Sequence, residues 1–207
     1  GLVPQFYKGA YGGMVTVDGI EAGKTPVAQL CGHVGLVFQN PFNQLSGAKD
    51  NVYEEVAFGM QNLGVPAEEM KKRVEEALKL LDIWQYRDRN PFDLSGGQMQ
   101  RVAIASVLVM RPDVMILDEP TSSLNDEDAK MLLDLLMEFK KNGLTSIIIT
   151  HKLNEIIYCA DRCTIILRIF RQSGDWSAMQ RCSIFLCRRF WNISHRISDS
   201  LETGDMS

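Results

Sequence analysis

Residues 113–120 read Asp113-Val-Met-Ile-Leu-Asp118-Glu119-Pro120, an apolar run that ends in two adjacent carboxylates. Such an uninterrupted apolar run is typical of a strand that is buried on both faces of a parallel sheet. In open α/β sheets, ligands bind beyond the carboxyl ends of the strands. The stretch therefore predicts a buried strand, with Asp118 and Glu119 placed at a ligand site.

Similar apolar runs alternate with helical patterns on both sides of this stretch. Strands are predicted at residues 14–17, 34–38, 113–118, 144–150 and 162–167, and amphipathic helices at 97–110, 126–141 and 152–160. This alternation predicts an α/β fold with a parallel sheet, because parallel neighbours need a helical crossover. Residues 50–88 interrupt it with two helical patterns, the second opened by Pro66, and predict a helical subdomain at about 45–95.

The composition is that of a folded globular protein. Among the 207 residues, 45% are hydrophobic and 23% are charged, which excludes wholesale disorder and low-complexity sequence. The longest apolar stretch, 102–110, is far shorter than the roughly 20 residues that cross a bilayer. A net charge of -4 gives no overall attraction to polyanions, so no nucleic-acid partner is expected. The five cysteines lack CxxC spacing and are expected to be thiols in a reducing compartment.

Two further polar residues directly follow predicted strands. Gln39 follows the strand at 34–38, and His151 follows the strand at 144–150. A single strand-end glutamine or histidine is more often an ordinary loop residue, and Asp-Glu-Pro commonly opens a turn. Because the carboxyl ends of parallel strands meet at one edge of a sheet, the joint occurrence of these two residues with Asp118-Glu119 favours a shared site.

A glycine-rich segment, Leu94-Ser95-Gly96-Gly97-Gln98, stands at the start of the helix predicted at 97–110. Ser95 and Gln98 have the spacing of an N-terminal capping box. The paired glycines remove side chains from a helix start, whose free N–H groups favour anions. A well-capped surface helix would explain Ser95 and Gln98 but gives no reason for two glycines in the first turn. The segment is therefore predicted to bind phosphate.

In order and spacing, these motifs resemble those of the nucleotide-binding subunits of ABC transporters over about residues 1–168. The matching residues are Gln39 for the Q-loop, 94–98 for the signature motif, 114–118 with Glu119 for the Walker B strand and catalytic glutamate, 123–125 for the D-loop, and His151 for the switch histidine. The resemblance implies a P-loop NTPase-like parallel sheet core with an antiparallel β edge and a helical insertion subdomain. Residues 37–44 and 55–59 are most similar to the ATPases of energy-coupling-factor importers, which take up vitamins and transition-metal ions.

The resemblance also implies a chemistry for each motif. The cofactors would be ATP and Mg²⁺, with Asp118 and Gln39 on the metal ion and Glu119 polarising the attacking water. His151 and Gln39 would sense the γ-phosphate, as further catalytic residues. In the family, the signature serine and second glycine contact ATP that is bound to the opposite protomer. The expected nucleotide-binding residues are Ser95, Gly96, Gly97, Gln98 and Asn125.

The implied partners follow from that composite site. A second ABC ATPase domain, identical or paralogous, would complete each site. A transmembrane transporter subunit would dock on the helical insertion and on the loop after Gln39. The protein is therefore expected at the cytoplasmic face of the cell membrane, as a peripheral ATPase that powers import of a small solute such as a vitamin or a metal ion.

Two alternative functions share part of this pattern. The ATPase heads of DNA-repair and chromosome-organising proteins have the same signature and Walker B motifs, but they carry a long coiled coil between the Q-loop and the signature. Residues 40–94 lack sustained heptads, which disfavours this alternative. The other alternative is a truncated, inactive product or a regulatory domain of the same family.

The first departure from the family pattern concerns the Walker A loop, G-x-x-x-x-G-K-[ST]. This loop is expected upstream of Gly1, so the 207-residue chain alone is expected to hydrolyse little or no ATP. Gly23-Lys24-Thr25 has the right ending, but Asp18 stands where the first glycine belongs. Pro26 also disfavours helical geometry at Thr25. We expect a β-turn at Asp18-Gly19 instead.

Two further departures lie later in the chain. Asn125 replaces the usual D-loop aspartate; it is predicted to cap the helix at 126–141 and to weaken communication across the dimer. The tail, 169–207, lacks the expected Asp-Gly turn and any periodicity, so we expect it to be irregular, as an unrelated extension or a frame-shifted product. The lack of periodicity also disfavours two functional interpretations of the tail, a basic aromatic patch at 188–191 and a zinc site from Cys182, Cys187 and His195.

Overall fold

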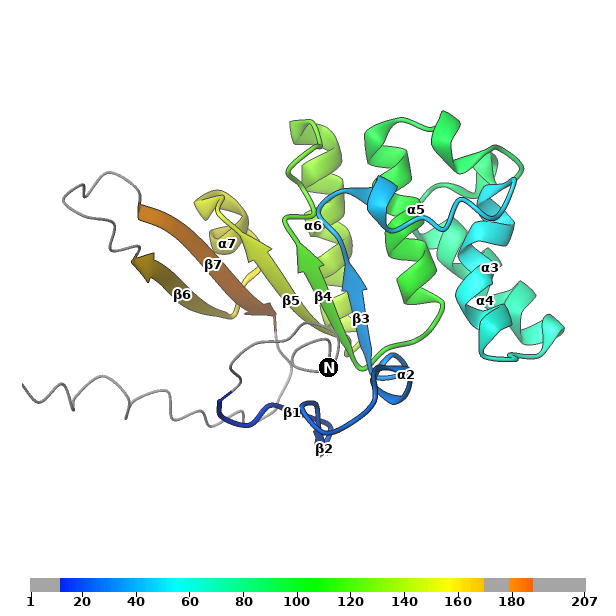
Figure 1. Cartoon of the computed structure of the whole chain (residues 1–207). Helices are drawn as coiled ribbons and strands as arrows, with labels where there is room; N and C mark the ends of the chain where they lie inside the picture. The colour runs from blue at the N-terminus through cyan, green and yellow to red at the C-terminus, as the bar shows by residue number, and fades with distance from the viewer. Residues whose placement is uncertain (1–11, 170–178, 188–207) are drawn as a thin grey trace, which may run out of the picture.

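The computed structural model describes residues 12–169 and 179–187, and their central element is a five-stranded sheet (Figure 1). The strand order is β3-β4-β5-β7-β6. The bounds are β3 (Val34–Val37), β4 (Val114–Asp118), β5 (Thr145–Thr150), β6 (Arg162–Ile169) and β7 (Met179–Cys187). The first three strands are parallel, and β7 runs antiparallel to both β5 and β6. The predicted α/β fold with a parallel sheet core is therefore confirmed.

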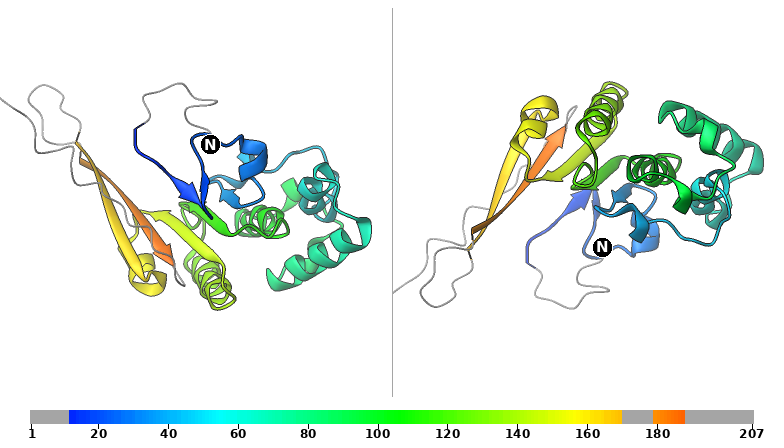
Figure 2. Two further views of the ribbon diagram at one scale, coloured as in Figure 1. Left: turned by 90° about the horizontal axis from the view of Figure 1, so that it is seen from below. Right: turned by 90° about the horizontal axis from the view of Figure 1, so that it is seen from above.

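The helices predicted from periodicity form in the expected order. The bounds are α5 (Gly96–Leu108), α6 (Asp126–Lys141) and α7 (Leu153–Cys159). The crossover through α6 joins β4 to β5 and allows the two strands to lie parallel. Figure 2 shows α6 and α7 on one side of the sheet and the N-terminal hairpin on the other.

One face of the sheet carries the hydrophobic core. Val37, Leu117 and Ile148 are in register on neighbouring strands, and all three are buried. They cluster with apolar residues of α5 and α6. Ile116 and Ile147 alternate with them on the other face and are half-buried. The sequence predicts that these strands are fully buried on both faces. In the described part of the chain, the helices fully bury only the face that carries Val37, Leu117 and Ile148.

Two helices form where residues 50–88 show helical patterns, and they are α3 (Val52–Asn62) and α4 (Ala67–Leu80). The Asn51 side chain caps α3 by accepting a hydrogen bond from the Glu54 N–H (2.8 Å), and Pro66 directly precedes α4. Their buried apolar residues join the same core as α5. Short 3-10 turns at Pro41–Asn43, Trp84–Tyr86 and Pro91–Asp93 connect these helices to the sheet and to α5. Within residues 12–169 and 179–187, no helix has both the length and the hydrophobicity to span a bilayer.

A short antiparallel hairpin, β1 (Thr16–Val17) and β2 (Ile20–Glu21), precedes the sheet. Asp18 and Gly19 connect its strands with φ angles of 48° and 77°. Two successive left-handed residues are what a type I′ hairpin turn requires, and Asp-Gly is a preferred pair for it. The β-turn predicted at Asp18-Gly19 is confirmed.

The segment Gly23-Lys24-Thr25 continues this hairpin as a turn. The backbone N–H groups of Lys24 and Thr25 both donate to the Glu21 carbonyl oxygen, at 3.2 and 3.1 Å. The Thr25 hydroxyl donates to the same oxygen at 2.8 Å. The following helix, α2 (Val27–Leu30), begins only after Pro26. These contacts agree with the prediction that the segment is not a phosphate-binding loop.

The largest difference from the sequence prediction is β7. The sequence shows no periodicity after residue 169 and predicts irregular structure there, yet Met179–Cys187 forms a strand, so the prediction is wrong for this segment. β7 pairs with β5 on one side and with the whole length of β6 on the other. Two flanking strands supply backbone hydrogen-bond partners, so a short β-prone run such as 184–186 is sufficient. Residues 170–178 and 188–207, including His195 and the patch at 188–191, lie outside the described residues.

Candidate functional site

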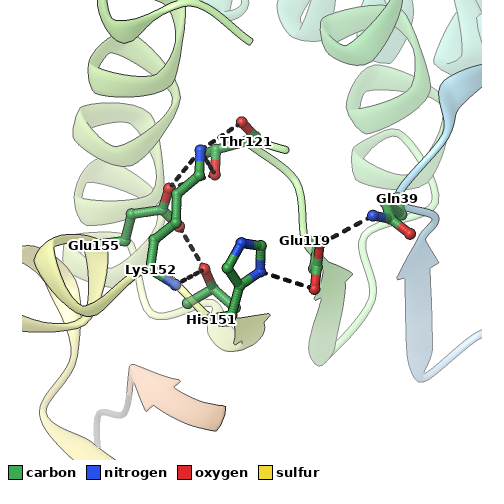
Figure 3. A network of polar contacts seen from close by, with 7 residues as sticks. Gln39, Glu119, Thr121, His151, Lys152 and Glu155 are labelled. Carbon is green, nitrogen blue, oxygen red and sulfur yellow. Dashed lines mark hydrogen bonds and ion pairs between the residues drawn. The ribbon is translucent and has the colours of Figure 1, made fainter. Parts of the chain in front are cut away.

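Three predicted site residues meet at the carboxyl ends of β3, β4 and β5 (Figure 3). The Gln39 side-chain amide donates from Nε2 to Glu119 Oε2 at 2.9 Å. His151 Nδ1 lies 3.0 Å from Glu119 Oε1 and donates to it, because an ionised carboxylate only accepts. Each oxygen of Glu119 therefore accepts one hydrogen bond. We call Gln39, Asp118, Glu119 and His151 the strand-end group.

The backbone of Glu119 is in an unusual conformation. Its φ angle is 40°, in the left-handed region that a residue with a side chain seldom adopts. Its N–H donates to the Ile149 carbonyl oxygen on β5 at 2.8 Å, which holds this conformation in place. Left-handed residues other than glycine cost of order 1–3 kcal/mol and concentrate at functional sites.

Asp118, directly before Glu119, is the predicted metal ligand. Burial raises the pKa of its carboxyl group above the ordinary value, and the charge of Glu119 raises it further. Among the described residues, no lysine or arginine forms an ion pair with either carboxylate. A divalent cation would offset this charge. The Asp118 carboxylate and the Gln39 amide oxygen are hard oxygen donors of the kind that Mg²⁺ prefers, so the residues present fit this ion.

A buried ionic network supports the strand-end group, and sequence reasoning missed it. Glu155 on α7 is 5% exposed. Its carboxylate accepts hydrogen bonds from the hydroxyl groups of Thr121 and of Thr150, the latter at 2.9 Å. Lys152 Nζ lies 3.4 Å from the same carboxylate and donates to the Thr121 carbonyl oxygen at 2.9 Å (Figure 3). Thr121 lies two residues after Glu119 and Thr150 directly before His151, so the network joins the segments that carry both side chains.

The glycine-rich segment begins α5 as predicted. The Ser95 hydroxyl accepts from the Gln98 N–H at 3.3 Å, and the Gln98 side chain accepts from the Ser95 N–H at 3.1 Å, which completes the capping box. Gly96 is exposed, and a Cβ built on it meets nothing within 4 Å. Gly97 is buried, and a Cβ there would lie 2.7 Å from Asp128 Oδ2 on α6. The two glycines therefore have different roles: Gly96 leaves the surface open, and Gly97 leaves room for the Asp128 carboxylate.

Asn125 caps α6 as predicted. Its Oδ1 accepts from the Asp128 N–H at 2.8 Å, and its Nδ2 donates to Asp128 Oδ2 at 3.0 Å. We call residues 95–98 with Asn125 the helix-start group. In the described part of the chain, no hydrogen bond joins this group directly to the strand-end group, and its two halves are linked through Asp128.

A pair of exposed aromatic rings lies beside these groups. Two Asn-Pro-Phe turns, 40–42 and 90–92, each have an asparagine side chain that accepts from the phenylalanine N–H, at 3.0 and 2.9 Å. Phe42 and Phe92 are 55% and 41% exposed, and their rings stack with centroids 6.1 Å apart. Phe42 follows Gln39 by three residues, and Phe92 precedes Ser95 by three. The pair therefore connects the segment that follows β3 to the turn that precedes α5.

Comparison with known proteins agrees with these features. Residues 5–122 match the ABC transporter family. A relative from Pyrococcus abyssi, named as an ABC transporter ATP-binding protein, is 45% identical over 80% of this chain and 59% of its own length. The energy-coupling factor transporter ATP-binding protein EcfA1 of Streptococcus thermophilus is 44% identical over 70% of this chain and 52% of its own length. The chain thus spans a little over half the length of the curated relatives that it matches.

Solved structures with a similar fold have the same family assignment. CbiO1 from Clostridium perfringens, part of the ABC transporter complex CbiONQ, aligns with a TM-score of 0.63 and 42% identity over 69% of this chain and 57% of that one. The ATP-binding cassette MJ0796, a dimer in a post-hydrolysis state with ADP and Pi, aligns with a TM-score of 0.58 and 28% identity. That alignment covers 67% of this chain and 62% of MJ0796. By sequence match and by fold, the chain belongs to the ABC transporter family of ATP-binding proteins.

Proposed function

We propose that this protein binds and hydrolyses ATP, with Glu119 as the residue that polarises the attacking water. The observation that carries the proposal is the position of Glu119 between Gln39 and His151 at the carboxyl ends of three parallel strands. Each oxygen of its carboxylate accepts one hydrogen bond and keeps a second lone pair that can accept from water. The two neighbours therefore orient the base without occupying all of its acceptor sites.

Mg²⁺ and ATP fit this arrangement. Asp118 and Gln39 would hold the metal ion, which when bound neutralises charge on the β- and γ-phosphates. Glu119 would accept a hydrogen bond from the water that attacks the γ-phosphate. Gln39 and His151 would hold the Glu119 carboxylate in position, because both donate a hydrogen bond to it. The same two side chains would respond to the presence of the γ-phosphate.

The helix-start group supports a site that is shared between two ATPase domains. The capping box uses only part of the α5 N-terminus, and the exposed Gly96 leaves its backbone accessible to an anion. Ser95, Gly96, Gly97, Gln98 and Asn125 would contact the nucleotide bound by an identical or paralogous second domain. The dimeric state of MJ0796 supports this arrangement.

We also propose that ATP hydrolysis powers import of a small solute, a vitamin or a metal ion, at the cytoplasmic face of the membrane. The similarity to the energy-coupling factor transporter protein EcfA1 and to CbiO1 of the CbiONQ transporter complex supports this assignment. A transmembrane subunit would dock on α3, α4 and the exposed Phe42–Phe92 pair. Exposed aromatic side chains provide rigid apolar area at interfaces, so these rings are suited to such a contact.

The test of the hydrolytic function is Glu119→Gln in the protein assembled with its transporter partners. The substitution keeps the size of the side chain and removes the charge that polarises water. We expect ATP turnover to fall by about a hundredfold or more, with ATP binding retained. Glu138→Gln, at an exposed glutamate near the end of α6, serves as the matched control. Unchanged turnover in Glu119→Gln would reject the role of Glu119, and no turnover in the wild-type complex would favour a regulatory function.

A further inference from the structure

One carboxylate, that of Asp128, joins the two halves of the helix-start group. Its Oδ1 accepts from Arg101 Nη2 on α5 at 2.8 Å, and the side chains of Asp128 and Arg101 are 29% and 16% exposed. Its Oδ2 accepts from Asn125 Nδ2 at 3.0 Å. The same oxygen lies where a Cβ on Gly97 would meet it at 2.7 Å. Both oxygens of Asp128 are therefore engaged, one by α5 and the other by Asn125.

Asn125 is held at both ends of its side chain by this one residue. Its carbonyl oxygen accepts from the Asp128 backbone, and its amide nitrogen donates to the Asp128 carboxylate. An aspartate at 125 would retain the cap, because Asn and Asp are comparable N-cap residues. It would, however, place a carboxylate oxygen 3.0 Å from Asp128 Oδ2, where like charges repel. The structure thus gives a reason for asparagine at 125 that capping alone does not.

We propose that Asp128 is a positioning residue that fixes Asn125 to the start of α5, and that asparagine at 125 is the partner this carboxylate requires. Asn125, Asp128, Arg101 and Gly97 form what we call the Asp128 link. The link makes the D-loop and the start of α5 move as one unit, so a displacement of either is passed to the other. Its effect on catalysis rests on the function proposed above, in which both elements face the nucleotide of the second domain.

The bond from Asn125 to Asp128 bears on one expectation from the sequence. Asn125 is predicted there to weaken communication across the dimer, because it lacks the charge of the usual aspartate. In the Asp128 link, the negative charge is that of Asp128, three residues after Asn125, and the Asn125 amide donates a hydrogen bond to it. The link therefore predicts that restoring the family's aspartate at 125 damages the protein.

The experiment compares Asn125→Asp with the charge-exchanged double variant Asn125→Asp/Asp128→Asn in the assembled transporter. The double variant again pairs one amide with one carboxylate at 125 and 128, leaves an amide oxygen at 128 to accept from Arg101 in place of the carboxylate, and retains the cap. We expect Asn125→Asp to speed hydrogen exchange at the amides of residues 98–102 about fivefold and to lower kcat about tenfold. The double variant is expected to recover most of both effects. Because the cap persists, the unfolding midpoint of Asn125→Asp should change by only about 2 °C or less.

Two further measurements make the result specific. Asn51→Asp introduces the same change at the N-cap of α3, where the asparagine side chain accepts the capping hydrogen bond from the Glu54 N–H. It should leave hydrogen exchange at residues 98–102 unchanged. Asp128→Asn alone, which places no like charges together, should weaken the link less than Asn125→Asp does. A double variant no better than Asn125→Asp would overturn the proposal. Hydrogen exchange needs no nucleotide, so the predicted exchange pattern in a complex without ATP turnover would uphold the link and reject the proposed function.

Discussion

The strand-end group and the helix-start group are held in place by different physical means. Behind the strand-end group lies a buried carboxylate, Glu155, which two threonine hydroxyls and Lys152 satisfy. Behind the helix-start group lies Asp128, which is partly exposed. Its carboxylate pairs with Arg101 and lies close to Gly97. The first arrangement resists change because breaking it leaves buried polar groups without partners, and the second also because a side chain on Gly97 would meet the Asp128 carboxylate.

The two groups illustrate two ways of positioning side chains. A buried ionic network costs desolvation but fixes the segments that carry Glu119 and His151 from behind. A glycine contact needs no buried charge, and Gly97 leaves the space that the Asp128 carboxylate of α6 occupies. The two regions should therefore fail differently: the strand-end group through lost polar partners alone, and the helix-start group also through added volume at Gly97.

The largest effect is expected from Glu155→Ala. Removing this carboxylate leaves the buried hydroxyls of Thr121 and Thr150 without their acceptor and takes an ion-pair partner from Lys152, so we expect the free energy of unfolding to fall by about 2–4 kcal/mol in urea titrations. Glu155→Gln, which keeps one acceptor oxygen, should lose less. Glu68→Ala, at the exposed start of α4, is the control and should change stability by about 0.5 kcal/mol or less. Equal effects at Glu155 and Glu68 would show that the network does not support the strand-end group.

These supporting residues mark the limit of what the sequence predicts. The strands, helices and strand-end residues follow from apolar runs and from the rule that parallel strands share an edge, and the capping box follows from local spacing. Glu155 gives no such signal, because a glutamate in the first turn of a helix is normally an exposed partner of the helix dipole. Asp128 is equally inconspicuous within an acidic helix start. Both roles depend on contacts between residues more than 25 positions apart, which periodicity does not report.

The same limit explains why the sequence does not predict the strand β7. Its residues lack a pattern that separates one face from the other, so periodicity indicates irregular structure. The strand forms because β5 and β6 provide partners on both sides, and that pairing is a property of the assembled sheet. Where a strand is defined by its neighbours rather than by its own alternation, the sequence of that segment alone does not predict it.

An intermediate effect is expected from Gly97→Ala. The new methyl group would lie 2.7 Å from Asp128 Oδ2 and 2.9 Å from its carboxylate carbon, so α6 or the Asp128 side chain must shift. We expect a loss of about 1–3 kcal/mol in the free energy of unfolding. Gly96→Ala, one residue earlier, meets nothing within 4 Å and should be neutral or stabilising by up to about 1 kcal/mol. If both alanine variants had the same stability, the close approach of Asp128 to Gly97 would not hold the helix-start group.

A smaller effect is expected from Ser95→Ala. The substitution removes the hydroxyl that accepts from the Gln98 N–H and leaves the first turn of α5 without its cap. N-cap serines replaced by alanine lose typically about 1 kcal/mol, and thermal unfolding of the variant should show this loss. Ser95→Thr keeps the hydroxyl and should restore most of the stability. A loss as large as that of Glu155→Ala would mean that the helix-start group depends on its polar contacts as strongly as the strand-end group does.

The smallest effect is expected from Asp118→Asn. Its sign tells whether protein contacts offset the charge of this carboxylate. The pKa of Asp118 is raised in the folded chain by burial and by the charge of Glu119, so the folded state binds this proton more tightly than the unfolded state does. Its contribution therefore favours folding at low pH and is lost as the pH rises through the folded-state pKa. With a chelator present, Asp118→Asn should be more stable than the wild type at pH 7, by less than about 1 kcal/mol because the site is partly solvated. The difference should vanish below the ordinary pKa of 3.8, where the carboxyl group is protonated in both states. Urea unfolding at several pH values measures both limits. A less stable variant at pH 7 would mean that protein contacts, rather than a metal ion, offset this charge.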